Sequence, residues 1–240
     1  MQERYLGDVH DYVKFALLRL FIHTLDVRLG INWYLADPCK VDKKGNRDGR
    51  KRGYLHKKEW EGLDPDLHRA LQSFADPANQ SLKEFQRAGI LSEDTIFFNE
   101  EVPLLNARKD WHCRALSAIT KADLVFLDPD TGFQKKTMQN RESPKYVLYD
   151  EAADYCRNGK SAVVIQFMPR RDPVEFAEEV RKNLGGRADS VPVVHGRAEK
   201  NILFFTLAQP VHVNPMTDAL REFAENSPPM KGGRRIDLIH

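Results

Sequence analysis

The chain has 240 residues, of which 41% are hydrophobic and 30% are charged, as is usual for a globular protein. Its 37 basic and 35 acidic residues leave a net charge of +2, so the overall charge does not by itself indicate a nucleic-acid partner. The sequence has neither an apolar run of the roughly 18 residues that a membrane span needs nor the apolar core of a secretion signal, so we expect no membrane partner.

The length favours one domain, which we expect to span residues 1–226 and to carry a basic loop at residues 37–53. Residues 227–240 are rich in Pro, Gly and Arg and are expected to form a loose tail. The chain has three cysteines, which lie far apart in sequence: Cys39, Cys113 and Cys156. They fit neither a disulfide framework nor a zinc site and therefore indicate a cytoplasmic protein.

Hydrophobic periodicity and capping residues predict a series of helices, with Asp8 and Ser81 as N-caps and Asp172 at the start of a later helix. The expected helices cover, in chain order, residues 9–21, 65–75, 81–89, 105–120, 144–158, 173–184 and 215–225. Apolar runs bounded by turn residues predict buried strands between these helices. The expected strands cover residues 30–36, 94–98, 123–127, 161–168, 189–195 and 201–208.

Strands that alternate with helices predict an α/β fold with a doubly wound, mostly parallel sheet of about six or seven strands. Only a short polar turn separates the last two strands, so we expect them to form an antiparallel hairpin. The sequence contains no G-x-G-x-x-G after the first strand, no P-loop and no nucleophile elbow.

The strand at residues 123–127 leads directly into the turn Asp128-Pro129-Asp130-Thr131-Gly132. Ligands of open α/β sheets bind beyond the carboxyl ends of the strands, so we expect Asp128 and Asp130 at the mouth of a site. Two close carboxylates suit a divalent metal, a proton acceptor or a site for an amino group. The alternative is a tight turn in which Asp130 only shapes the turn and caps a helix.

A second acidic cluster opens the first helix, where Asp8, Asp11 and Lys14 follow one another at intervals of three. An N-cap at Asp8 and an ordinary Asp11–Lys14 pair explain these residues without any ligand. In the other interpretation, these side chains belong to a functional site.

Asp37 follows the first strand and is expected to share a cleft with Asp128, because the carboxyl ends of neighbouring strands converge. Residues 40–52 contain seven basic and two acidic residues, which suits either a phosphate-rich partner or a solvated insertion. Arg50 in this loop is a candidate for substrate binding.

Two further residues are candidates for contact with a substrate. Arg170 follows a buried strand, where its guanidinium either binds a phosphate or carboxylate or is simply solvated. Phe133, next to the acidic turn, is a candidate for stacking on a base.

In order and spacing, these motifs resemble the J-type large-subunit ribosomal RNA adenine methyltransferases. The family has an Ala-Gly-Asn-x-x-Asp-x-x-Lys helix, an Asp-Pro-Pro-Tyr motif and a strand that ends in Tyr-Pro. The matching segments here are Gly7-Asp8-x-x-Asp11-x-x-Lys14, Asp128-Pro129 and Met168-Pro169. The resemblance implies the Rossmann-like fold of class I S-adenosylmethionine-dependent methyltransferases, whose sheet ends in a hairpin with one strand inserted antiparallel.

The resemblance also implies roles for single residues. It places four residues near the cofactor: Asp8, Asp11, Lys14 and Asp37. It makes Asp128 the group that accepts the hydrogen bond and the proton of the target amino group, with Asp130 beside it. The sequence departs from the family at Asp130, which replaces the second proline, at Thr131, which replaces the base-stacking aromatic residue, and at Asp8, which replaces an asparagine.

The chain is more similar still to a set of uncharacterised bacterial proteins. They share the Gly-Asp-x-x-Asp-x-x-Lys helix, the segment Trp33-Tyr34-Leu35, the loop Asn46-x-Asp48-Gly49-Arg50 and the Asp-Pro-Asp-x-Gly turn. This similarity supports the choice of residues and implies no particular reaction.

The leading hypothesis is therefore a methyltransferase-like enzyme that uses S-adenosylmethionine and acts on an amino group of a nucleic acid or nucleotide. The alternative is a nuclease or phosphodiesterase dependent on Mg²⁺ or Mn²⁺, since hard oxygen ligands suit these ions. Its metal ligands would be Asp8, Asp11, Asp48, Asp128 and Asp130. A third possibility is a binding module that has the scaffold without the chemistry.

Overall fold

The structure is a computed structural model and describes residues 1–41, 51–230 and 233–240. The helices are α1 (Val9–Leu25), α2 (Pro38–Val41), α3 (Pro65–Leu71), α4 (Leu82–Arg87), α5 (Arg108–Ala118), α6 (Tyr149–Arg157), α7 (Pro173–Asn183) and α8 (Val213–Glu225). Short 3₁₀ helices cover Glu3–Tyr5, Gly53–His56, Lys58–Trp60, Gln72–Ala75, Pro77–Asn79, Leu105–Ala107, Asn140–Lys145 and Pro210–His212. The strands are β1 (Leu29–Asn32), β2 (Ile96–Phe98), β3 (Leu124–Leu127), β4 (Gly132–Phe133), β5 (Tyr146–Val147), β6 (Ser161–Phe167), β7 (Val193–Arg197), β8 (Asn201–Leu207), β9 (Pro229–Met230), β10 (Gly233–Arg234) and β11 (Ile236–Ile239).

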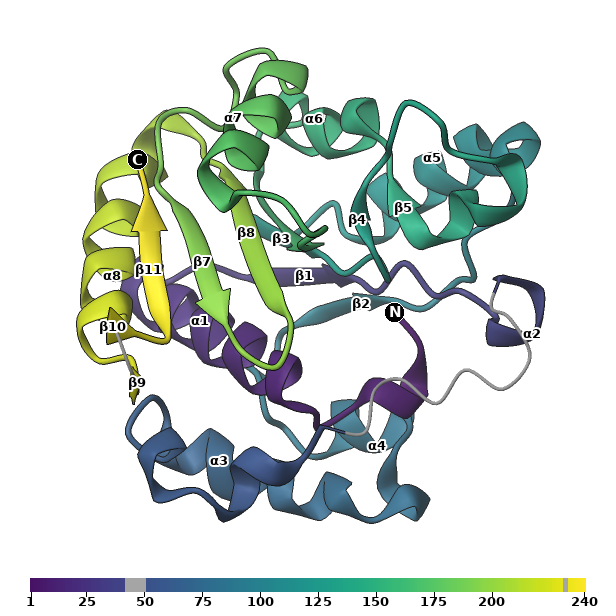
Figure 1. Cartoon of the computed structure of the whole chain (residues 1–240). Coiled ribbons are helices and arrows are strands. Elements are labelled where there is room, and N and C mark those ends of the chain that lie inside the picture. The colour runs from purple at the N-terminus through teal and green to yellow at the C-terminus, as the bar shows by residue number, and fades with distance from the viewer. Residues whose placement is uncertain (42–50, 231–232) are drawn as a thin grey trace.

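The central sheet has seven strands in the order β11-β7-β8-β6-β3-β1-β2 (Figure 1). Strands β2, β1, β3 and β6 are parallel to one another, whereas β8 is antiparallel to both β6 and β7. The predicted α/β fold with a mostly parallel sheet and a C-terminal antiparallel hairpin is thus confirmed. The hairpin places β8 between β6 and β7, so one antiparallel strand is inserted into the sheet.

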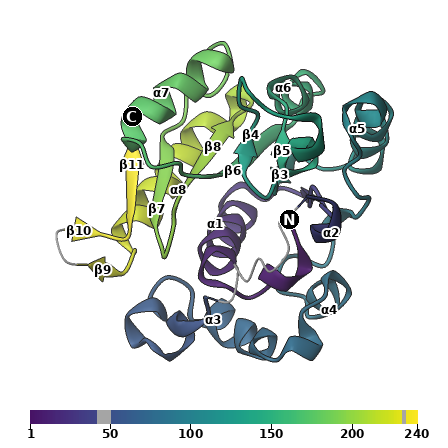
Figure 2. The ribbon, with the colours of Figure 1, turned by 45° about the vertical axis from the view of Figure 1, so that its right-hand side comes forward.

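Helices cover both faces of this sheet (Figures 1 and 2). The residues of β3 alternate between these two faces. Leu124 and Phe126 belong to the hydrophobic core under α1 and α8. Val125 and Leu127 belong to the hydrophobic core under α5, α6 and α7. Both faces of a parallel strand are buried in this way, which accounts for its continuous apolar run. The small helices α3 and α4 lie beyond α1 at the bottom of Figure 1.

The C-terminal segment is not a loose tail, and that expectation is wrong. Strand β11 pairs antiparallel with β7 and adds an edge to the sheet. Its residues Ile236 and Ile239 are 1% and 7% exposed, so their burial holds the segment in place. The Pro- and Gly-rich composition includes β9 and β10, two short strands that pair antiparallel before β11.

The helix expected at residues 144–158 also begins later than predicted. Pro144 lies inside the 3₁₀ helix Asn140–Lys145, and β5 follows before α6 starts at Tyr149. The guanidinium of Arg108 donates to the carbonyl groups of Ser143 and Tyr146, which holds this stretch out of a regular helix. Strand β5 then pairs with β4 in a small parallel sheet above the carboxyl end of β3.

Candidate functional site

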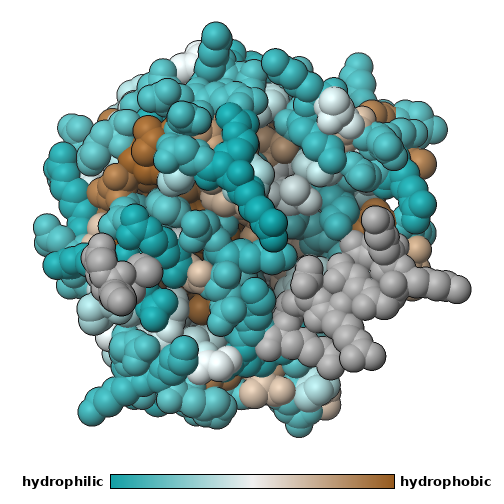
Figure 3. Space-filling view, in the orientation of Figure 1, coloured by the Kyte–Doolittle hydropathy of each residue, from teal (hydrophilic) through white to brown (hydrophobic). Residues whose placement is uncertain are grey.

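A cavity of about 830 Å³ lies beyond the carboxyl ends of β3 and β6. The turn after β3, the end of β6, the first turns of α1 and one side of α7 form its walls. Hydrophilic residues cover most of the surface seen in Figure 3, with an apolar patch at the upper left. The cavity occupies the edge of the sheet at which α/β proteins bind their ligands.

Lys14 joins two acidic residues in the buried part of this cavity. Its Nζ lies 2.6 Å from Asp11 Oδ1 and 2.8 Å from Asp128 Oδ2. The side chain of Lys14 is 2% exposed and its ammonium lies against the rings of Phe15 and Trp33, at 4.7 and 5.7 Å from their centroids. The sequence-adjacent Asp11–Lys14 pair is therefore part of a three-residue buried cluster and not a pair on an exposed helix surface.

Burial and charge shift the pKa values of this cluster. Burial raises the pKa of Asp11 to about 6, against the attraction of Lys14. Burial opposes the charged form of Lys14, but Asp11 and Asp128 outweigh it and raise the pKa of Lys14 above its ordinary value. Lys14 is therefore a permanent cation that engages one oxygen of Asp128. Among the described residues, no N–H or O–H group donates to the other oxygen, Oδ1.

Asp8 caps the helix that carries Lys14 and also orients a histidine. Its Oδ1 accepts hydrogen bonds from the backbone N–H groups of His10 and Asp11, as predicted for an N-cap. Its Oδ2 lies 3.2 Å from His10 Nδ1. The ring of His10 packs edge-on against Phe167, so Asp8 positions both the helix start and one wall of the cavity.

Asp130 is held by the N-terminal residues. Gln2 Nε2 donates to Asp130 Oδ2 at 2.6 Å, and the amino group of Met1 lies 3.1 Å from Oδ1. The same amino group donates to the carbonyl oxygens of Tyr34 and Asp128. Asp130 therefore has partners within the chain, in contrast to Oδ1 of Asp128.

Phe133 and Tyr149 form an aromatic wall of the cavity. Their rings are nearly parallel, with centroids 4.9 Å apart and planes inclined by 7°. Phe133 is only 4% exposed, and its backbone N–H donates to Gln166 Oε1 at 2.8 Å. Gly132 is required here, because its φ is +128° and a Cβ at this position would lie 2.2 Å from Gln166 Oε1.

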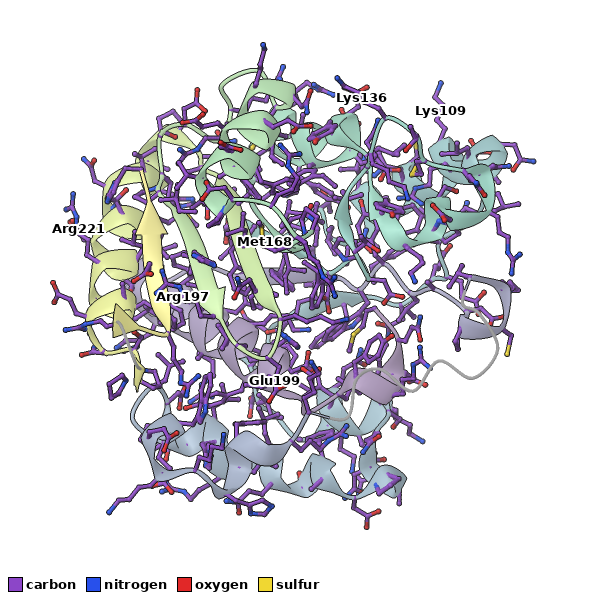
Figure 4. The ribbon with its side chains drawn as sticks, viewed as in Figure 1. Lys109, Lys136, Met168, Arg197, Glu199 and Arg221 are labelled. Atoms are coloured by element: carbon purple, nitrogen blue, oxygen red, sulfur yellow. The ribbon has the colours of Figure 1, made fainter. Side chains whose placement is uncertain are left out.

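Basic side chains surround the exposed part of the cavity. They come from separate segments of the chain: Lys51, Lys135, Lys136, Lys145, Arg171 and Lys200. Several have acidic neighbours, since Arg171 pairs with Glu179 and Lys135 with Glu142. Figure 4 shows Lys136 at the upper edge of the view and Met168, another wall residue, near its centre. The described walls thus combine buried acids with an exposed basic rim.

Asp37 does not line this cavity. It lies in a second cavity of about 760 Å³ beyond β1 and β2, with Lys40 and Glu101. The backbone N–H of Cys39 and the Lys40 ammonium lower the pKa of the Asp37 carboxyl. The sequence prediction that Asp37 and Asp128 share one cavity is therefore wrong. Tyr34, after β1, has a left-handed φ of 47°, and the next residue, Leu35, forms a parallel bridge with Glu101 of the second cavity.

The other predicted site residues divide as follows. The structure brings six together around the first cavity: Asp8, Asp11, Lys14, Asp128, Asp130 and Phe133. Arg170 is exposed and does not line the cavity, whereas its neighbour Arg171 does. Asp48 and Arg50 lie outside the described residues.

Sequence analysis missed a buried polar network that supports the aromatic wall. Arg108 Nε lies 2.6 Å from Glu151 Oε1, and Tyr34 donates to Glu151 Oε2 at 3.1 Å. Glu151 is in the first turn of α6, two residues after Tyr149. These residues come from elements that are distant in sequence, so no motif or spacing could have linked them.

No protein-family model matches the chain, and a search of curated proteins returns no significant match. None of the helices in the described part of the chain has the length and apolar character needed to cross a membrane.

Proposed function

We propose that this protein is an S-adenosylmethionine-dependent methyltransferase-like enzyme that acts on an amino group of a nucleic acid or nucleotide. The observation that carries the proposal is the position of Asp128 at the carboxyl end of β3, in a cavity, with Oδ1 open to a donor. The antiparallel insertion of β8 supports it, because the resemblance implied this arrangement for class I methyltransferases. Since one fold serves many functions, the proposal depends on the site more than on the sheet.

The charges of the cavity fit such a cofactor and substrate. Its buried walls carry four carboxyl groups, and the Lys14 ammonium and the Met1 amino group form ion pairs with three of them, Asp11, Asp128 and Asp130. This excess of negative charge suits the sulfonium and ammonium groups of S-adenosylmethionine. The basic rim suits the phosphates of a nucleotide. When bound, the cofactor supplies an electrophilic methyl group.

In this proposal Asp128 Oδ1 accepts a hydrogen bond from the target amino group and orients its nitrogen. Lys14 forms an ion pair with the Asp128 carboxylate and fixes its rotamer through Oδ2. Asp8 and Asp11 hold the first turn of α1 against the cavity. Positioning of this kind is the main contribution that a protein makes to a bimolecular transfer. Asp37, in the other cavity, has no contact with this ligand in the proposal.

The metal-dependent alternative is less well supported. The Lys14 ammonium already lies between Asp11 and Asp128, where a divalent cation would need both carboxylates. Within the residues that the structure describes, no group of three or more His, Cys, Asp or Glu side chains is arranged to hold a metal ion.

A thermal-shift and transfer assay tests the proposal. S-adenosylmethionine at millimolar concentration is expected to raise the melting temperature of the wild type and of Asp128→Asn, and methyl transfer to RNA, DNA or nucleotides is expected only with the wild type. Asp66→Asn, on the exposed side of α3, is the matched control and should behave as wild type. Absence of any shift would overturn the cofactor assignment. A shift with Mg²⁺ or Mn²⁺ that Asp128→Asn abolishes, together with cleavage of nucleic acid, would favour the metal-dependent alternative.

A further inference from the structure

Tyr149 presents an aromatic ring to the first cavity. One ring face is covered by Phe133, which stacks on it in parallel. In the described part of the chain, no second aromatic ring stacks on Tyr149. Tyr149 is half-buried, whereas Phe133 is nearly inaccessible. Tyr149 is thus the outer member of a two-ring stack, and a planar ligand would meet it before Phe133.

Contacts from three elements fix the orientation of this ring. The Tyr149 backbone N–H donates to Gln134 Oε1 at 3.2 Å, and Asn183 Nδ2 of α7 donates to the Tyr149 hydroxyl at 3.3 Å. Two residues later Glu151 holds the first turn of α6 through Arg108 and the backbone N–H of Leu148. A ring that is already fixed loses little conformational entropy when a ligand stacks on it.

The surroundings of Tyr149 favour a planar ligand that carries negative charge. Lys135, Lys136 and Lys145 line the same cavity and come from the segment that includes β4 and β5. The Lys135 ammonium lies 5.6 Å from the centroid of the Tyr146 ring, so positive charge and aromatic surface are adjacent. A nucleotide combines an aromatic base with phosphate in this way, and bases stack on aromatic side chains.

We propose that Tyr149 is the platform on which the base of a nucleotide substrate stacks. This inference rests on the proposed function for the nucleotide nature of the substrate. The acidic turn itself has Thr131 and no aromatic side chain beside Asp128 and Asp130, and Phe133 is covered. The stacking surface is therefore supplied by the start of α6.

Titration with adenosine 5′-monophosphate tests the platform directly. Tyr149→Leu is expected to weaken the binding of adenosine 5′-monophosphate about 5- to 150-fold, the range that loss of a base–aromatic stack produces. Tyr149→Phe keeps the ring and is expected to retain most of the affinity. Ribose 5-phosphate lacks a base and should bind the wild type and Tyr149→Leu equally. Circular dichroism and melting temperature establish that each variant is folded.

The outcomes separate this inference from the proposed function. The assignment of Tyr149 as the stacking platform is wrong if folded Tyr149→Leu binds adenosine 5′-monophosphate as tightly as wild type. It is also wrong if the substitution weakens the binding of ribose 5-phosphate to the same extent. Should Tyr149→Leu not fold, the comparison moves to Tyr149→Ser and Tyr149→Phe with the same criteria. If the binding of adenosine 5′-monophosphate depends on the Tyr149 ring but S-adenosylmethionine neither binds nor donates a methyl group, the stacking role of Tyr149 is supported and the methyltransferase proposal is refuted.

Discussion

Lys14 and Asp128 are 114 positions apart in sequence, yet Lys14 Nζ donates a hydrogen bond to Asp128 Oδ2 at 2.8 Å. This contact joins the first turns of α1 to the carboxyl end of β3. With Asp11 as the third member, it places two carboxylates and one ammonium in a buried cluster. The position of Asp128 therefore depends on a residue of the N-terminal helix.

Removing the ammonium should destabilise the fold strongly. Lys14→Met leaves two buried carboxylates without their cation, and breaking a buried pair in this way costs about 3–5 kcal/mol in the free energy of unfolding. Urea denaturation followed by circular dichroism measures the loss. Arg221→Met, which removes an exposed i,i+3 partner of Asp218, is the control and should change stability by about 0.5 kcal/mol or less. An equal effect of the two substitutions would contradict the buried cluster.

Asp11 should give the stability a characteristic pH dependence. Because burial raises its pKa from 3.8 to about 6, the native state binds the proton more tightly than the unfolded chain between these values. The contribution of Asp11 to the free energy of unfolding therefore decreases as the pH rises through this window. From about pH 4 to about pH 6.5, wild type should lose stability relative to Asp11→Asn in urea titrations. Parallel profiles for the two proteins would refute the shift, and Asp218→Asn serves as the exposed control.

The sequence carries enough information to predict the sheet and the location of the first cavity. Apolar runs such as residues 123–127 identify strands because both of their faces are buried, and the acidic turn marks the end of one of them. Asp8 is recognisable as an N-cap because capping is a local interaction.

Other features depend on contacts that are not local. Tyr34 adopts a left-handed conformation without being glycine, so its residue type does not predict this conformation. The sequence likewise does not show that Asp37 and Asp128 line different cavities. The pairing of β11 with β7 also cannot be predicted from the sequence, because the composition of the C-terminal segment favours a loop. Tyr149 has no motif around it, and its proposed role as a stacking platform depends on its contact with Phe133.

Gly132 is expected to be essential to the shape of the acidic turn. Gly132→Ala combines an unfavourable φ of +128° with a Cβ placed on the Gln166 amide, so it should cost at least about 2 kcal/mol. The Phe133–Gln166 hydrogen bond would also be displaced, so ligand binding in the first cavity should weaken. Gly62→Ala is the matched control, because a Cβ there meets nothing within 4 Å. Thermal unfolding of the two variants makes the comparison, and a Gly132→Ala protein as stable as Gly62→Ala would exclude this constraint.

Arg108 should stabilise the segments that carry the aromatic wall of the first cavity. Its guanidinium binds Glu151 through two nitrogens and also donates to the Tyr146 and Ser143 carbonyl groups. Arg108→Met leaves the Glu151 carboxylate buried without its cation and should cost about 3–5 kcal/mol in the free energy of unfolding.

The helix that carries Arg108 also provides the control for this prediction. Arg114 lies on α5 as well, but its salt bridge to Glu100 is exposed, so Arg114→Met should leave the urea midpoint almost unchanged. Arg108→Lys separates charge from geometry, because an ammonium cannot form the paired hydrogen bonds of the guanidinium. If Arg108→Lys is as stable as wild type, charge alone suffices. A loss smaller than that of Arg108→Met is the expected result, because the ammonium keeps a cation beside Glu151 but cannot hold both the β5 segment and the first turn of α6.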